Sequence, residues 1–286
     1  MSKPIITAEV ETVTPEMAKQ YLETNVKNRR VVKSNVLYFV DALKEGHFLN
    51  TGQGIIFDNE SQLRDGQHRL MAIVETSIPA DMLVIRGVEK NVFKVLDSGV
   101  KRTVGQNLGM VGTKNANIVA ATARAVIAYD KNHSFSRKAD SFAVFDLAEK
   151  HPMMSELGTI TNAASKETGL SPSMLSTIGF LASRNGSTER FAEFCAKIAT
   201  GVGIQSGDPR LALRSLSMKR KQREQWTQEY TFSVIAQAWN AYIGCSPTKR
   251  IHAKRSDNNS YKRPEVILAT DPLYQADPEV FFASPR

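Results

Sequence analysis

The chain has 286 residues and a formal net charge of +8 at pH 7, and 42% of its residues are hydrophobic and 23% charged. This composition is typical of a globular chain with one large or two modest domains, and no apolar run approaches the roughly eighteen residues of a membrane-spanning helix. The two cysteines, Cys195 and Cys245, form no C-x-x-C motif, and the first residues lack the apolar core of a signal peptide. We therefore expect a cytoplasmic protein without a disulfide framework, a cysteine zinc site or a membrane partner.

The first part of the chain alternates short strand and helix patterns. Strands are expected at residues 5–13, 54–58 and 82–85, where apolar runs are bounded by polar or turn residues. Thr14 followed by Pro15 is typical of a capped helix start, and a second helix is expected from Ser34 to Gly46. Residues 25–30, between these helices, form a polar and basic connection. The alternation predicts a mixed α/β domain.

A short motif, Asp-Gly-Gln-His-Arg at residues 65–69, joins the second strand to a helix in which Leu70 and Ile73 recur at helical spacing. A helix start presents unpaired N–H groups and the positive end of the helix dipole, so it suits a bound phosphate. Arg69 offers a forked charge for phosphate oxygens. The alternative is an ordinary capped helix start, with Asp65 as the N-cap and Arg69 in a surface ion pair.

A second glycine-containing basic segment, at residues 98–102, repeats this pattern: a small residue and cations precede a helix start. The alternative for this segment is a simple basic turn. The phosphate-binding candidates of the two segments are Gly66, Gln67, His68, Arg69, Ser98, Gly99, Lys101 and Arg102.

From residue 115 onward the pattern is almost wholly helical. Helices are expected at residues 115–131, 141–150, 191–199, 210–223 and 226–243. The aromatic residues of the last of these helices are assigned to the core rather than to a base-stacking surface. The tail at residues 271–286 carries two phenylalanines and is expected to strap back onto the body of the protein.

A candidate helix-turn-helix lies near residues 160–181. A helix ends at Gly169, and a new one begins with Ser171 as its cap and Pro172 at its first position. The second helix is expected to expose Ser173, Ser176 and Thr177, which are poor readers of base edges. Two short helices joined by a glycine turn, without any role in DNA binding, are the alternative.

Positive charge concentrates between Arg210 and Arg263, where the acids are Glu224, Glu229 and Asp257. This imbalance favours contact with a polyanion, mostly through DNA phosphates, although a solvated basic face is the alternative. Residues 252–263 are interpreted as a basic, mobile arm. The DNA-binding candidates are Lys219, Arg220, Lys221, Arg223, Lys249, Arg250, Lys254 and Arg255.

The motif at residues 65–69 resembles the phosphate-binding box of the ParB/sulfiredoxin superfamily, and residues 14–18 and 97–103 resemble flanking segments of the same domain. The resemblance covers about the first 110 residues. It implies a nucleoside triphosphate, CTP or ATP, bound with Mg²⁺. Asp65 and His68 are then the catalytic candidates, and Asp65 is also the metal candidate. Gln67 replaces the cysteine of sulfiredoxins, which argues against that activity, and His68 replaces the first arginine of the ParB box.

The helical part is similar to proteins of phages and prophages that begin with a ParB-like domain. Residues 199–201, 207–214 and 238–241 carry this similarity, which implies an origin in a phage or mobile element, and hence the cytoplasm of a bacterial host.

Together the patterns predict an α+β protein: a ParB/sulfiredoxin-like nucleotide-binding domain at residues 1–112, a helical domain at 113–250, and a basic arm and tail at 251–286. The expected function is DNA-associated nucleotide binding, with or without hydrolysis, in which the triphosphate regulates DNA binding. A Mg²⁺-dependent phosphotransferase or nuclease, with Asp65 as the metal or base residue, is one alternative. A DNA-binding protein with a purely structural motif is the other. The oligomeric state stays open.

Overall fold

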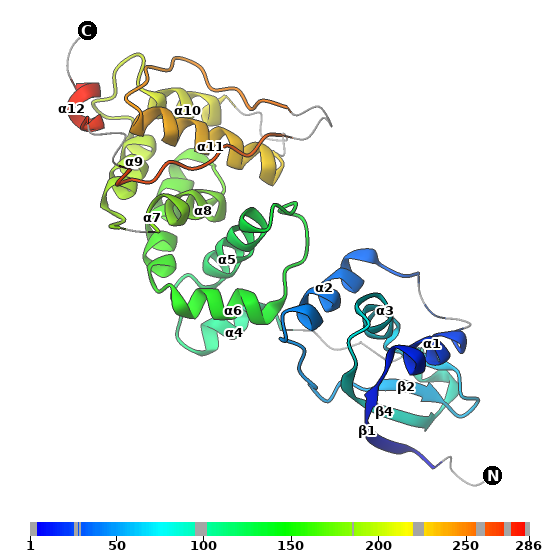
Figure 1. Cartoon of the computed structure of the whole chain (residues 1–286). Coiled ribbons are helices and arrows are strands. Elements are labelled where there is room, and N and C mark those ends of the chain that lie inside the picture. Colours follow the sequence, from blue (N-terminus) through cyan, green and yellow to red (C-terminus); the bar gives the residue numbers. More distant parts are fainter. Residues whose placement is uncertain are drawn as a thin grey trace. The chain divides into compact units, whose positions relative to one another are not determined.

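The computed structural model describes residues 5–25, 28, 30–94, 102–184, 186–219, 226–255, 261–271 and 276–283. The chain is α+β, as expected: a four-stranded sheet with helices near the N-terminus is followed by a helical part (Figure 1). Contacts divide it into two compact units: unit 1 is Met1–Arg102 with Lys138–Ala143, and unit 2 is Thr103–Arg137 with Val144–Arg286. This division falls at residue 102 rather than 112, and residues 251–286 group with the helical unit.

The sheet of unit 1 has the order β1-β4-β2-β3. Its strands are β1 (Thr7–Val13), β2 (Ile55–Asp58), β3 (Leu63–Asp65) and β4 (Ala80–Val88). β4 pairs antiparallel with β1 and parallel with β2, and β3 folds back antiparallel on β2. β4 is longer than the expected strand at 82–85. The short β3 was missed because two of its three residues, Arg64 and Asp65, are charged, and strand propensity is weak at such positions.

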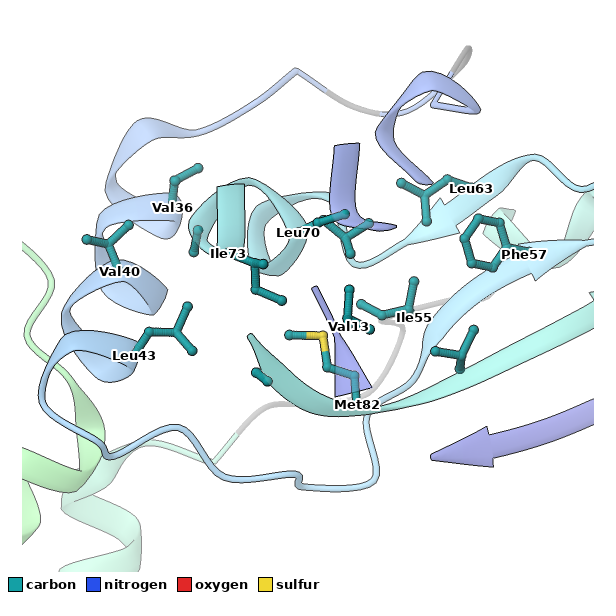
Figure 2. Close-up of a cluster of buried hydrophobic side chains, with 14 residues drawn as sticks. Val13, Val36, Val40, Leu43, Ile55, Phe57, Leu63, Leu70, Ile73 and Met82 are labelled. Atoms are coloured by element: carbon teal, nitrogen blue, oxygen red, sulfur yellow. The ribbon is translucent and has the colours of Figure 1, made fainter. Parts of the chain in front are cut away.

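Three helices of unit 1, α1 (Pro15–Glu23), α2 (Lys33–Lys44) and α3 (Gln67–Thr76), surround one apolar core with the sheet. Figure 2 shows Leu70 and Ile73 of α3 between the side chains of α2 and those of the strands. Both are fully buried, as are Val13 and Ile55. The burial of these apolar side chains fixes α3 against the sheet and α2. The N-terminus of α3 is therefore held in one position within unit 1.

The remaining helices are listed here in chain order. The 3₁₀ helix η1 (Lys90–Lys94) follows β4 in unit 1. The others are α4 (Val104–Met110), α5 (Ala116–Asp130), α6 (Ser141–Lys150), α7 (Met153–Thr168), α8 (Pro172–Ala182), α9 (Glu189–Thr200), α10 (Pro209–Met218), α11 (Gln228–Ile243) and α12 (Pro278–Ala283). The core of unit 2 contains fully buried aromatic side chains, among them Phe191, Phe194, Phe232, Trp239 and Tyr242. No helix among the described residues is long and apolar enough to span a membrane.

The helix-turn-helix candidate corresponds to α7, the turn at Gly169 and α8. The local prediction is confirmed: Gly169 has φ +69°, and the Ser171 hydroxyl accepts a hydrogen bond from the backbone N–H of Met174. The expected exposure is wrong, because Ser176 and Thr177 are 0% exposed. α8 packs against α5, α7 and α11 on several sides, as a helix that is apolar all round must. A helix buried in this way cannot enter a DNA groove as a recognition helix.

The C-terminal tail packs back onto unit 2, as expected. The ring of Phe282 in α12 stacks on Tyr242 of α11 with 6.2 Å between centroids, and Glu279 accepts a hydrogen bond from the Tyr242 hydroxyl at 2.8 Å. Of the arm expected at residues 252–263, residues 256–260 lie outside the described residues, and the described C-terminal end is held by hydrogen bonds. Arg263 donates to the Asn132 side chain at 2.7 Å and to the His133 carbonyl at 2.5 Å, which anchors that end of the segment at the end of α5.

Candidate functional site

The motif at residues 65–69 forms a strand–turn–helix in unit 1. β3 ends at Asp65, Gly66 is the N-cap of α3, and no side chain caps this helix. Gly66 has φ +107°, and a Cβ there would overlap the side chain of Ile55. Glycine is therefore favoured at this position both by the positive φ and by the lack of room for a Cβ beside Ile55. The alternative with Asp65 as the N-cap is wrong, because the turn passes through a left-handed residue directly before the helix.

Two side chains of the motif are buried and face the connection between α1 and α2. Gln67 is 4% exposed, and its Oε1 accepts a hydrogen bond from Asn25 Nδ2 at 3.1 Å. His68 is 7% exposed, and its Nε2 accepts from the backbone N–H of Val32 at 3.1 Å. Accepting this bond requires an unprotonated Nε2. Gln67 and His68 therefore position the connection between α1 and α2, and Nε2, one of the two ring nitrogens of His68, is already bonded.

Arg69 ties the first turn of α3 to the loop before β2. Its guanidinium donates to the carbonyl oxygens of Gln53 and Gly54, the latter at 2.8 Å. It also lies 3.4 Å from the Asp65 carboxylate, in a pair whose side chains are 11% and 36% exposed. The expected surface ion pair thus exists, but the stronger contacts are to the backbone. A phosphate that reaches Arg69 would compete with Asp65 for the same guanidinium.

Described residues of the connection between α1 and α2 bond to β3 and α3, which the sequence patterns did not predict. Asn28 Nδ2 donates to the carbonyl of Leu63 at 3.0 Å, beside the Asn25–Gln67 bond. Asn25 Oδ1 is buried and has no partner among the described residues, so a ligand N–H or O–H would satisfy it. Arg30 is exposed two residues before Val32, which bonds to His68. A basic connection carries no distinctive motif, so only the fold brings it to α3.

The turn between β2 and β3 is held by a buried ion pair. Asp58 is 2% exposed; it accepts the backbone N–H groups of Glu60 and Gln62 at 2.9 Å and Arg64 Nε at 2.7 Å. Burial raises the pKa of Asp58, but the bonds from Gln62, Arg64 and Glu60 together lower it more, so this pKa lies below its ordinary value. The charged form of Asp58 therefore stabilises the hairpin that leads into the motif.

A metal ion would find few protein ligands at the motif. The described part of the chain contains no group of three or more His, Cys, Asp or Glu side chains placed to hold one. Asp65 is thus a single candidate ligand. Mg²⁺ in nucleotide sites is commonly bound by one or two carboxylates together with the substrate phosphates, so this arrangement fits a metal that arrives with a nucleotide.

The second basic segment is described only at its end. Ser98, Gly99 and Lys101 lie outside the described residues, whereas Arg102 is exposed and ends unit 1. The next residue, Thr103, caps α4: its hydroxyl accepts from the N–H of Gln106, whose side chain accepts from the N–H of Thr103. This capping box satisfies N–H groups at the start of α4 that the sequence pattern offered to a phosphate.

The basic stretch separates into structural and exposed cations. Arg210 is 3% exposed and pairs with Asp208 and Glu279, and Arg214 donates to the carbonyl oxygens of Ile198 and Ala199 at the end of α9. Arg220, Lys221 and Arg223 lie outside the described residues. The exposed DNA-binding candidates are Lys219, Lys249, Arg250, Lys254 and Arg255.

Comparison with known proteins adds no assignment. No family model matches the chain, and no curated protein and no solved structure matches it.

Proposed function

We propose that this chain is a DNA-associated protein that binds a nucleoside triphosphate at residues 65–69 and uses it to regulate DNA binding. The observation that carries the proposal is the N-terminus of α3: it starts at a glycine without a side-chain cap, and the buried face of the helix holds it in place. Helix N-termini of this kind bind phosphates through backbone N–H groups and the helix dipole.

The surroundings of this helix start support an anionic ligand with polar groups. Arg69 provides positive charge at the turn, the exposed Arg30 lies two residues before Val32, which bonds to His68, and Asn25 Oδ1 offers an acceptor to a base or sugar. Asp65, at 3.4 Å from Arg69, would give up this contact to a phosphate and turn to Mg²⁺. Under this proposal Arg69 keeps its bonds to the loop before β2 and adds a phosphate oxygen.

The competing function is DNA binding with a purely structural motif. The bonds from Arg69 to the Gln53 and Gly54 carbonyls favour it, because they give this arginine a role in the fold without any ligand. A direct binding measurement distinguishes the two.

Thermal unfolding with CTP, ATP, GTP and UTP, each with and without Mg²⁺, tests the proposal. A ligand at about one hundred times its Kd stabilises the folded state by about 2.7 kcal/mol, which raises the Tm measurably. Arg30→Gln removes an exposed charge without touching the bonds of Arg69, and we expect it to weaken binding about fivefold. Lys90→Gln, another exposed cation of unit 1, is the matched control. If no nucleotide shifts the Tm, the nucleotide-binding proposal is wrong and the motif has a purely structural role.

DNA association is tested separately by fluorescence anisotropy on two unrelated duplexes over a salt series. Phosphate contacts make the affinity fall steeply with salt and depend little on sequence. Replacing the exposed Lys249 and Arg250 by glutamine is expected to weaken both duplexes equally and to flatten the salt dependence. Addition of the nucleotide that shifts the Tm should change the DNA affinity. An affinity that is the same with and without it would contradict the regulatory part.

A further inference from the structure

Three aromatic side chains form a ladder at the start of α11 that is separate from the buried core. The ring centroids of Trp226 and Tyr230 lie 4.9 Å apart, and those of Tyr230 and Tyr261 lie 5.0 Å apart; both pairs pack edge to face. All three side chains are half-buried, whereas Phe232 and Trp239 of the same helix are fully buried. The aromatic side chains in the middle of α11 lie in the core, as expected, whereas Trp226 and Tyr230 at its beginning are half-buried.

The ladder continues into a single antiparallel β-bridge, called the basic ribbon below. Arg255 pairs antiparallel with Tyr261, and the N–H of Lys262 donates to the carbonyl of Lys254 at 2.9 Å. The Arg255 guanidinium lies 4.8 Å from the centre of the Tyr261 ring and donates to its hydroxyl at 3.1 Å. The cation therefore sits on the last ring of the ladder, where it covers an aromatic face and carries a positive charge.

The same pairing places two further cations opposite each other. Lys254 and Lys262 lie opposite each other next to the Arg255–Tyr261 bridge, on the other face of the ribbon from Arg255, and both are exposed. Like charges directly opposite in a sheet destabilise it, and a bound anion relieves this repulsion. The nearest acid on α11, Glu229, is engaged elsewhere: its carboxylate accepts from Ser134 Oγ at 2.9 Å and from the N–H of Phe135 at 3.2 Å.

We propose that the aromatic ladder and its basic ribbon bind single-stranded nucleic acid. Unpaired bases stack on Trp226 and Tyr230, Arg255 on the Tyr261 ring contacts the phosphates, and Lys254 and Lys262 add positive charge to the ribbon. In a duplex the base faces are covered by neighbouring bases, so stacking on side chains favours an unpaired strand. The proposal rests on the DNA association proposed above but is independent of the nucleotide site on α3.

Fluorescence anisotropy of the full chain with labelled strands of about 20 nucleotides tests the preference. The probes are single-stranded DNA, single-stranded RNA of the same sequence, and the DNA duplex. We expect the single strands to bind at least tenfold more tightly than the duplex. The ratio of the Kd for single-stranded DNA to the Kd for single-stranded RNA identifies the preferred sugar. Tyr230→Ala should lower the affinity for the single strands about tenfold and the affinity for the duplex only slightly. Lys254→Gln with Lys262→Gln should weaken all three probes, whereas the control pair Lys150→Gln with Lys166→Gln should not.

Tryptophan fluorescence gives an independent readout. The chain has two tryptophans, and Trp239 is fully buried with its indole N–H donated to the Ile267 carbonyl at 2.8 Å. Stacking of a base on Trp226 quenches its emission, so the quench should disappear in Trp226→Phe, which keeps an aromatic ring and most of the affinity. Equal affinity for single strand and duplex without quenching would overturn this proposal and leave DNA association intact. Tight, quenching single-strand binding supports it even if no nucleotide shifts the Tm.

Discussion

Replacing Arg210 by methionine should destabilise the protein by about 3–5 kcal/mol, because this removes one partner of a buried ion pair. Arg210 is 3% exposed and Asp208 2%, and two guanidinium nitrogens donate to the Asp208 carboxylate at distances between 2.8 and 3.2 Å. A third nitrogen donates to Glu279, and the guanidinium lies 4.5 Å from the centre of the Tyr242 ring. Without Arg210, Asp208 keeps the backbone N–H bond of its cap but loses its buried cationic partner.

Urea unfolding followed by circular dichroism measures this loss. The matched control is Arg184→Met, because Arg184 pairs with Asp130 at 2.6 Å but the two side chains are 36% and 45% exposed. Such an exposed pair contributes at most about 1 kcal/mol. A loss below about 1 kcal/mol in Arg210→Met would refute the reasoning. So would a loss of DNA affinity at unchanged stability, which would return Arg210 to the basic surface that the sequence suggested.

The remaining predictions concern unit 1. Gly66→Ala should cost about 1–3 kcal/mol in thermal unfolding, because a Cβ at φ +107° is strained and overlaps Ile55, while Gly46→Ala has open space and serves as a control for the backbone strain alone. Asp58 has a lowered pKa, so its stabilisation is present above its unfolded pKa and disappears as the pH falls through the folded value; Asp58→Asn should flatten the loss of stability below about pH 4 in acid titrations. Asp65→Asn should tighten triphosphate binding about fivefold without Mg²⁺ in calorimetry, since a carboxylate near Arg69 competes with phosphate, and weaker binding under those conditions would argue against the competition.

Local signals in the sequence determined much of this fold. Thr14 and Ser171 cap the helices that follow them, and Gly201 ends α9 in a left-handed conformation. The motif at residues 65–69 is a strand–turn–helix, and Gly66 is its turn glycine. Such features depend on hydrogen bonds and backbone angles within a few residues, so their physical causes are already present in the local sequence.

The tertiary structure alone decided which side chains are available for function. Ser176 and Thr177 look like surface residues in the sequence, yet the packing of α8 among three helices buries them. Arg210 looks like one more cation of a basic stretch, yet its second carboxylate partner is Glu279, 69 residues further along the chain. Charge and exposure depend on partners that only the folded chain brings together, and a linear pattern of cations does not contain them.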